Sequence, residues 1–86
     1  MKLSELRDYV KEGKVIFGYN QVSKYLKTKK LSFVVIAKNT PKHLRDDVLY
    51  LSKLARVEVV ETEKTSQELG MLCGKPFPVA VLGIKR

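Results

Sequence analysis

The segment Gly18-Tyr19-Asn20-Gln21-Val22-Ser23-Lys24 places hydrogen-bonding side chains at the expected start of a helix. A helix N-terminus presents unpaired backbone N–H groups and a partial positive charge, which favour phosphate or base acceptors. Asn20 and Gln21 each add an amide that can pair with the edge of a base, and Lys24 adds a charge one turn later. These residues indicate a nucleic-acid contact; the alternative is a capped helix with two surface amides.

A second candidate is the proline-braced segment Cys73-Gly74-Lys75-Pro76-Phe77-Pro78. An aromatic ring in such a loop can stack on an unpaired base, which is a common way of recognising irregular RNA. The alternative is that Phe77 packs into the core at the start of the last strand, because buried aromatic rings are common. The loop alone leaves both interpretations open.

Patterns for acid–base or metal chemistry are weak. His43 is the only histidine, and it is expected on the charged face of a helix without the partners that a general base needs. Asp46 and Asp47 are adjacent, so they point about 100° apart on a helix and are poorly placed to share one metal ion. We expect these carboxylates to pair with nearby cations instead. The candidate cations are Lys42, Arg45 and Lys53.

Nucleophilic catalysis is equally unsupported. Ser23, Ser66 and Cys73 have no base partner that the sequence reveals. The glycine motifs that bind dinucleotides or triphosphates are absent, and no cluster of metal ligands is visible. We therefore expect a non-enzymatic protein with no cofactor and no metal ion.

Positive charge is concentrated in the middle of the chain. The net charge is +8 and the pI about 9.8, values at which a nucleic-acid partner is a reasonable hypothesis. Residues 1–12 carry three basic and three acidic side chains, and residues 46–86 carry six of each, so both segments are neutral. The acid-free segment 13–45 carries the whole excess. Its cations are Lys14, Lys24, Lys27, Lys29, Lys30, Lys38, Lys42 and Arg45. Such a surface attracts phosphates; the alternative is a solvated helix face.

Hydrophobic spacing predicts the elements that must position these segments. The expected strands cover residues 15–17, 33–37, 57–61 and 79–84. The first expected helix runs from about Ser4 to Lys11, and the second runs from an Asn20 cap to about Thr28. The third begins at Pro41 after a Thr40 cap and runs to about Leu54. A short fourth helix begins at a capping box formed by Thr65 and Glu68 and ends at Gly74. Leu54 is expected to widen the apolar stripe of the third helix.

Alternating helices and strands predict an α/β fold. We expect a three-layer α/β/α sandwich with a four-stranded mixed sheet, mostly parallel. The length of 86 residues predicts one RNA-binding domain over residues 1–86. A membrane span and a signal peptide are not expected, and the single cysteine suits a reducing cytoplasm. The protein is expected to be monomeric alone.

Four motifs resemble the kink-turn-binding ribosomal protein superfamily of the L-seven-Ae and L-thirty-e type, most closely the branch called large-subunit protein thirty in archaea and eukaryotes. The motifs are Gly18–Lys24, Val35-Ile36-Ala37-Lys38-Asn39-Thr40-Pro41, Thr65-Ser66-Gln67-Glu68-Leu69-Gly70 and Gly74-Lys75-Pro76-Phe77. Together they span most of the chain in the same order. The resemblance implies an α/β/α sandwich that grips a kink-turn, an RNA helix–loop–helix bent at tandem sheared G·A pairs.

The resemblance also implies roles for individual residues. Gly18 would allow close backbone approach, with Tyr19 beside it, and Asn20 and Gln21 would read the guanines. The loop formed by Lys75, Pro76, Phe77 and Pro78 would cover the extruded nucleotide. Lys24 would hold bases or phosphate, and Lys38, after the buried strand, would support the same site. Lys27, on the outward face of the second helix, is expected from its charge to contact phosphates. Structured RNA, in particular ribosomal RNA, is then the expected partner, together with other ribonucleoprotein components in a cytoplasmic, ribosome-associated setting.

Two departures from the family pattern leave alternatives open. Many relatives have a glutamate where this chain has Gln21, and a neutral amide is a weaker acceptor than a carboxylate. The chain also stops soon after the last strand. A stand-alone kink-turn regulator or a small-RNA particle component is therefore an alternative to a ribosomal subunit protein. A small ligand-binding domain or enzyme, and a protein adaptor that uses the third helix, are more distant alternatives.

Overall fold

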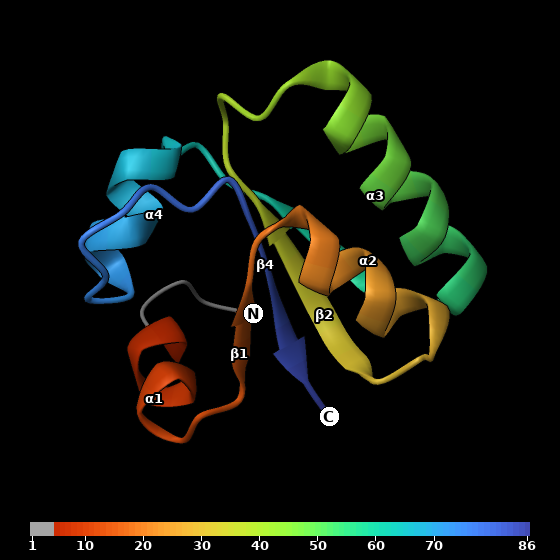
Figure 1. The fold of residues 1–86 in the computed structure, drawn as a ribbon, viewed down its shortest axis with the longest axis horizontal. Coiled ribbons are helices and arrows are strands. Elements are labelled where there is room, and N and C mark those ends of the chain that lie inside the picture. Colours follow the sequence, from red (N-terminus) through yellow and green to blue (C-terminus); the bar gives the residue numbers. More distant parts are fainter. Residues whose placement is uncertain (1–4) are drawn as a thin grey trace.

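In residues 5–86, which the structure (a computed structural model) describes, four strands form one sheet between two pairs of helices (Figure 1). The elements in chain order are α1 (Leu6–Lys11), β1 (Val15–Phe17), α2 (Tyr19–Lys27), β2 (Leu31–Ile36), α3 (Lys42–Ala55), β3 (Glu58–Glu61), α4 (Ser66–Leu72) and β4 (Val81–Lys85). The predicted α/β fold with a mixed sheet and helices on both faces is confirmed. The predicted start of the first helix at Ser4 lies outside the described residues.

The strand order is β1-β4-β2-β3, with β4 running antiparallel between β1 and β2 and with β2 parallel to β3. The expectation of a mostly parallel sheet is therefore wrong for the pairing of strands. The antiparallel direction of β4 follows from the short α4, whose seven residues extend only about 10 Å. The loop after α4 brings the chain back to the edge where β3 ended, so β4 enters the sheet from that edge and runs against its neighbours.

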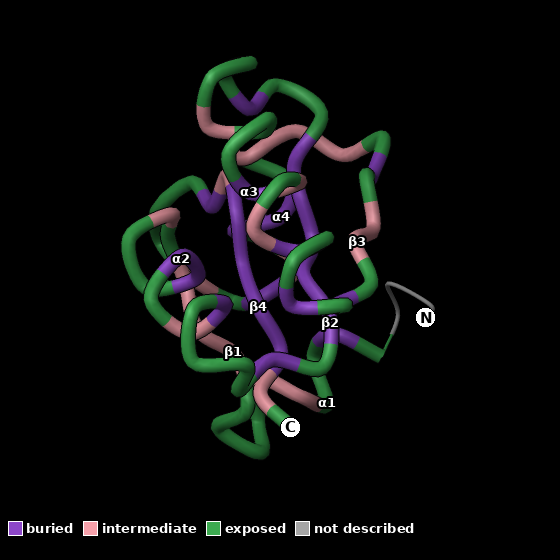
Figure 2. Tube along the Cα trace, turned by 90° about the vertical axis from the view of Figure 1, so that its right-hand side faces the viewer, coloured by how far each residue is buried: buried purple, intermediate pink, exposed green. Residues whose placement is uncertain are grey.

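Each face of the sheet has its own hydrophobic core. Phe33 and Val35 point to the face that α1 and α4 cover, where Leu6 and Leu69 are fully buried. The intervening Val34 points to the face that α2 and α3 cover. Figure 2 shows β2 and β4 as the buried centre of the molecule. The continuous apolar run of β2 follows from this two-sided burial, because successive strand residues face opposite layers.

The start of α3 and the exposure of Leu54 differ from the prediction, whereas the helix ends at Ala55, close to the predicted Leu54. Pro41 is the N-cap and not the first helical residue, and Thr40 precedes it. The Thr40 hydroxyl donates instead to the carbonyl oxygens of Ala37 (2.9 Å) and Ala80 (3.0 Å), which ties β2 to the segment before β4. Leu54 does not widen the buried stripe, because its side chain is 61% exposed. This exposed leucine leaves apolar surface near the end of the helix.

The N-terminus of α4 has the predicted capping box. The Glu68 amide donates to the Thr65 hydroxyl (3.3 Å), and the Thr65 amide donates to the Glu68 carboxylate (3.1 Å). The bond from the Thr65 backbone is the main reason why the pKa of Glu68 lies below its usual value. The capping box thus fixes the start of the helix that precedes the Lys75–Pro78 loop.

We expect Thr65→Ala to lower the free energy of unfolding by about 1 kcal/mol, the usual contribution of an N-cap side chain. Urea denaturation of the two proteins measures this difference. Because the folded-state pKa of Glu68 is lowered, its contribution is complete at neutral pH, and it is lost as the pH falls below the ordinary glutamate pKa of about 4 and through the lower pKa of the folded state. Thr65→Ala keeps the backbone N–H that donates to Glu68, so Glu68→Ala is the variant that tests this pH dependence. The difference in stability between the wild type and Glu68→Ala should narrow in acid; a difference that grows there would contradict the capping role of Glu68.

Candidate nucleic-acid interface

The segments singled out by the sequence meet at one edge of the sheet. Phe17 at the end of β1 lies opposite Leu82, and Ile36 at the end of β2 lies opposite Val81, where β4 begins. The Gly18 amide donates to the carbonyl of Val81 (2.9 Å). The start of α2, the end of β2 and the loop that leads into β4 are therefore held together by backbone pairing.

Gly18, and not the predicted Asn20, is the N-cap of α2. Its backbone has φ 93° and ψ 151°, a conformation that residues with a Cβ atom rarely adopt. The Gly18 carbonyl accepts from the Val22 amide (3.1 Å), so the helix already begins at Tyr19. Asn20 and Gln21 consequently lie in the first turn, where both side chains are exposed and neither is used for capping. Their amides are available to a ligand at the helix end.

Tyr19 fixes the start of α2 against α3. Its hydroxyl donates to the carboxylate of Asp47, and this hydrogen bond is the main reason why the pKa of Tyr19 is raised. The expected pairing of the aspartates with neighbouring cations is wrong for Asp47, because the tyrosine takes that carboxylate. Arg45 instead forms an ion pair with Glu61 on β3. Both contacts connect α3 to the edge of the sheet that carries the candidate interface.

The Lys75–Pro78 loop packs closely on α4. The Lys75 amide donates to the Gly70 carbonyl (2.9 Å), and the Val79 amide donates to the Ser66 carbonyl (2.9 Å). A Cβ atom at Gly70 would lie 2.2 Å from the carbonyl oxygen of Phe77, so only a glycine permits this packing. The loop is held by α4 in one position.

Phe77 does not enter the core. Its ring is 47% exposed and packs edge-to-face on Phe17, with 6.3 Å between the ring centroids. The ammonium group of Lys75 lies 5.2 Å from the centroid of the Phe17 ring, within the range of a cation–π contact. Phe17 therefore joins the end of β1 to the loop and leaves one side of Phe77 open.

A hollow of about 340 Å³ separates the start of α2 from the loop. The end of β1 and the start of α2 form one wall, the loop forms the opposite wall, and α3 contributes one leucine. The lining residues are Phe17, Gly18, Tyr19, Leu44, Phe77, Pro78, Val79, Ala80 and Val81. Two predicted site segments that are far apart in the sequence thus share one mostly apolar concavity.

The predicted lysines do not all lie at this hollow. Lys24 is exposed on α2, one turn beyond Asn20. Lys38 follows β2 and lies beside a separate polar cleft with Arg45. Lys27 is two turns from Tyr19, about 12 Å along the helix axis. Lys27 therefore lies at the far end of α2, and only a ligand that extends along the helix would reach both ends.

The sequence did not indicate Phe17, Leu44 or Ala80 as part of this concavity. Phe17 resembles the last residue of any short apolar strand, and Leu44 fits the buried stripe of α3. In the structure both are only partly buried and line the hollow. The available signal was indirect: a half-buried apolar residue directly before a turn-forming glycine is suited to a binding wall.

Within residues 5–86, no three histidine, cysteine or acidic side chains are grouped closely enough to bind a metal ion. The thiol of Cys73 is buried, and burial raises its pKa above the usual value, which disfavours the reactive thiolate. No helix in this part of the chain has the length and apolar character needed to cross a membrane.

Comparison with known proteins gives the family. Residues 2–86 match the profile of the Ribosomal protein L7Ae/L30e/S12e/Gadd45 family. The chain belongs to this family. Among its relatives, large ribosomal subunit protein eL30 of Methanocaldococcus jannaschii is 47% identical over 77 residues, which are 90% of this chain and 70% of that protein. Protein eL30 of Sulfurisphaera tokodaii is 38% identical over 81 residues, which are 94% of this chain and 76% of that protein. These two relatives of the L7Ae/L30e-type chain are ribosomal proteins and not enzymes, as expected from the sequence.

Solved structures support the L7Ae-type fold. A protein of unknown function from Bacillus halodurans superposes with a TM-score of 0.90 at 23% identity, covering 98% of this chain and 83% of that one. The 15.5kD RNA binding protein of Giardia lamblia superposes with a TM-score of 0.85 at 19% identity, covering 98% of this chain and 70% of that one. The resemblance inferred from the four sequence motifs is therefore confirmed for family and fold.

Proposed function

We propose that this protein binds RNA as a component of the large ribosomal subunit and recognises a kink-turn, an RNA helix–loop–helix bent at tandem G·A pairs. The observation that carries the proposal is the shared hollow between the start of α2 and the Lys75–Pro78 loop, together with the exposed amides of Asn20 and Gln21, which follow the lining residue Tyr19 in the first turn of α2. Family membership and the eL30 names of the relatives support a ribosomal role. The acid-free segment 13–45 supports a polyanionic partner.

The start of α2 is the proposed reader of sequence. Backbone N–H groups in the first turn lack intrahelical partners, and no acidic residue in this turn offsets their partial positive charge. Asn20 and Gln21 add side-chain amides that can pair with guanine edges at the G·A pairs. Gly18 carries no Cβ atom, so RNA can approach the backbone, and the Tyr19–Asp47 hydrogen bond keeps the helix end in place. Gln21 makes its contact without the charge of a glutamate.

The loop is proposed to cover the nucleotide that the bend extrudes. Phe77 packs edge-to-face on Phe17, and nearly half of the surface of Phe77 is exposed and accessible to a base. Pro76 and Pro78 restrict the backbone, so less conformational freedom is lost on binding. Lys75 adds a cation next to the aromatic pair. The loop would therefore recognise an unpaired base by stacking, beside the reader on α2.

The exposed lysines, including Lys24, Lys27 and Lys38, are proposed to contact phosphates. We expect Lys27→Ala to weaken binding to kinked and straight RNA by the same factor, because a phosphate contact carries no sequence information. The slope of log K against log salt concentration should fall by about one unit at most. Titrations at several salt concentrations measure this slope. A loss confined to the kinked RNA would assign Lys27 to base recognition instead.

The proposal is tested by titrating the protein with two RNA hairpins that differ only in the internal loop. One contains the tandem G·A pairs, and the other has Watson–Crick pairs at the same positions. We expect the kinked RNA to bind at least about tenfold more tightly at equal salt. Equal affinities would mean that the protein binds RNA by charge alone, and the kink-turn proposal would then be wrong.

A further inference from the structure

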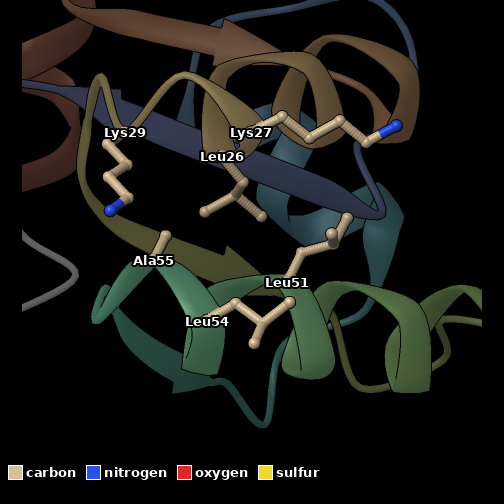
Figure 3. A pocket seen from close by; sticks show the side chains of 6 residues that line it. All are labelled: Leu26, Lys27, Lys29, Leu51, Leu54 and Ala55. Atoms are coloured by element: carbon tan, nitrogen blue, oxygen red, sulfur yellow. The ribbon is translucent and has the colours of Figure 1, made fainter.

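A second hollow lies between the C-terminal ends of α2 and α3, at the opposite end of α2 from Asn20 and Gln21, and Lys27 is the one lining residue also proposed to contact RNA. Its volume is about 240 Å³, and it is lined by Leu26, Lys27, Lys29, Leu51, Leu54 and Ala55. In Figure 3, Leu26 points from α2 toward α3, and the ammonium groups of Lys27 and Lys29 point to opposite sides of the hollow. The floor is aliphatic and the rim is basic. Since an apolar cavity of roughly 150 Å³ can hold benzene, this hollow has room for an aliphatic side chain.

Exposed apolar surface continues beyond the hollow along α3. Leu54 is 61% exposed, and Tyr50, one turn earlier on the same face, is 62% exposed. Tyrosine is enriched at protein interfaces, where its ring is buried and its hydroxyl is paired. Together with the hollow, these two side chains form an apolar strip that this chain leaves uncovered. We call the hollow and this strip the α2–α3 groove.

Basic side chains dominate the charge around the hollow, and the nearest acidic residues of α3, Asp46 and Asp47, lie one turn before Tyr50 and Leu51. Residues 19–36 and 48–57, which form the groove and its surroundings, contain no acidic residue. Lys27, Lys29, Lys53 and Arg56 are exposed there, and none of them forms an ion pair with another residue of the described part of the chain. A ligand with carboxylates around an apolar centre would therefore complement both the rim and the floor.

We propose that the α2–α3 groove binds an acidic amphipathic helix of a partner protein. A leucine-type side chain of this helix would enter the hollow, and its glutamates or aspartates would pair with Lys29 and the neighbouring cations. RNA fits the hollow less well, because phosphates need no apolar floor and because the floor is aliphatic. Of the residues that form the groove, Tyr50 beside the hollow alone has an aromatic ring on which a base could stack. The helix-in-groove mode explains the exposed leucine as well as the lysines.

The position of the groove allows it to be filled while RNA is bound. Asn20 and Gln21 lie in the first turn of α2, and the groove lies at the last turn of this nine-residue helix, about 8 to 10 Å away along the axis. The proposal does not depend on the proposed function, because neither hollow shares a lining residue with the other. A protein partner could thus be held next to the RNA.

The test uses a fluorescein-labelled peptide of about 15 residues, long enough to form a helix on binding. It carries leucines at i, i+3, i+4 and i+7 and glutamates at most other positions. A control peptide has serines in place of the leucines and the same charge. We expect fluorescence anisotropy to show saturable binding of the leucine peptide and at least about fivefold weaker binding of the serine peptide. Equal binding of the two peptides would reduce the groove to a basic patch and overturn the proposal.

Two variants locate the binding without damaging the fold. Leu54→Ala removes an exposed side chain from a helix, where alanine is the better helix former. Lys29→Gly removes a charge at a residue with φ 57°, a left-handed conformation that glycine adopts without strain. We expect both variants to keep or raise the midpoint of thermal unfolding. Each should bind the leucine peptide at least about fivefold more weakly than the wild type does.

The kinked RNA hairpin serves as the independent readout. Leu54→Ala should bind this RNA with the affinity of the wild type. A loss of affinity for the peptide without a loss of affinity for the RNA then locates peptide binding at the α2–α3 groove. Two results would overturn the proposal: unchanged peptide affinity in both variants, or displacement of the peptide by the kinked RNA. The second result would assign the groove to RNA. Failure of RNA recognition, with peptide binding intact, would count only against the proposed function.

Discussion

Asn20→Ala should weaken binding to the kinked RNA by about 1–3 kcal/mol, by analogy with good base contacts in DNA, which is roughly 5- to 150-fold. Its side chain is exposed in the first turn of α2 and does not cap the helix. Removing it therefore costs the fold little, and alanine is the better helix former. Binding to the straight control RNA should be almost unchanged, because that RNA is held by phosphate contacts. Titration of both RNAs with the wild type and the variant measures this difference.

Two further variants make the result specific. Asn20→Asp keeps the size of the side chain but replaces its NH₂ donor with a charged acceptor, so a base contact that needs the donor should be lost as in alanine. Lys27→Ala is the contrasting case, since it should affect both RNAs equally. If Asn20→Ala weakens both RNAs by the same factor, this asparagine does not read bases.

Gly70→Ala should destabilise the protein by about 1–3 kcal/mol and should also lower its affinity for the kinked RNA. In an isolated helix, this change would be favourable by about 1 kcal/mol, because alanine is the better helix former. Here the new Cβ atom would lie 2.2 Å from the carbonyl oxygen of Phe77 and 3.4 Å from the Cα atom of Pro78. Backbone atoms cannot rotate away as a side chain can. The clash should therefore outweigh the gain in helix propensity and displace the loop.

A matched control separates the loop from general instability. Gly13 has φ 71° and open space around it, so Gly13→Ala should destabilise through backbone strain alone. Urea denaturation compares the stabilities, and RNA titration under conditions where both variants are folded compares recognition. We expect Gly13→Ala to retain the preference for kinked RNA and Gly70→Ala to lose much of it. If both variants keep the full preference, the position of the loop does not matter for recognition.

Much of the fold follows from local sequence patterns. The continuous apolar run from Phe33 to Ala37 predicted a strand covered on both faces, because neither set of alternating side chains could face water, and all five residues are buried. The pair Thr65 and Glu68 predicted the start of α4, because a capping box depends on residues only three positions apart. Features that are decided within a few residues could be predicted in this way.

Features that depend on tertiary contacts could not be predicted from local sequence patterns. The position of β4 between β1 and β2 depends on how far α4 and the loop carry the chain, and spacing does not specify that path. The N-cap of α2 is Gly18 and not the predicted Asn20, and the Gly18 amide pairs with β4, a contact that only the folded chain makes. The Tyr19–Asp47 hydrogen bond joins two helices that only the finished fold brings together. The shared hollow next to Phe77 arises from the same long-range packing.

The most direct measurement is to crosslink the protein to RNA in living cells and to sequence the attached RNA. We expect the crosslinks to concentrate at a helix–loop–helix with tandem G·A pairs in large-subunit ribosomal RNA, and the crosslinked peptides to contain the start of α2 or the Lys75–Pro78 loop. Crosslinks spread evenly over ribosomal RNA, or peptides from other surfaces alone, would contradict kink-turn recognition by this edge of the sheet.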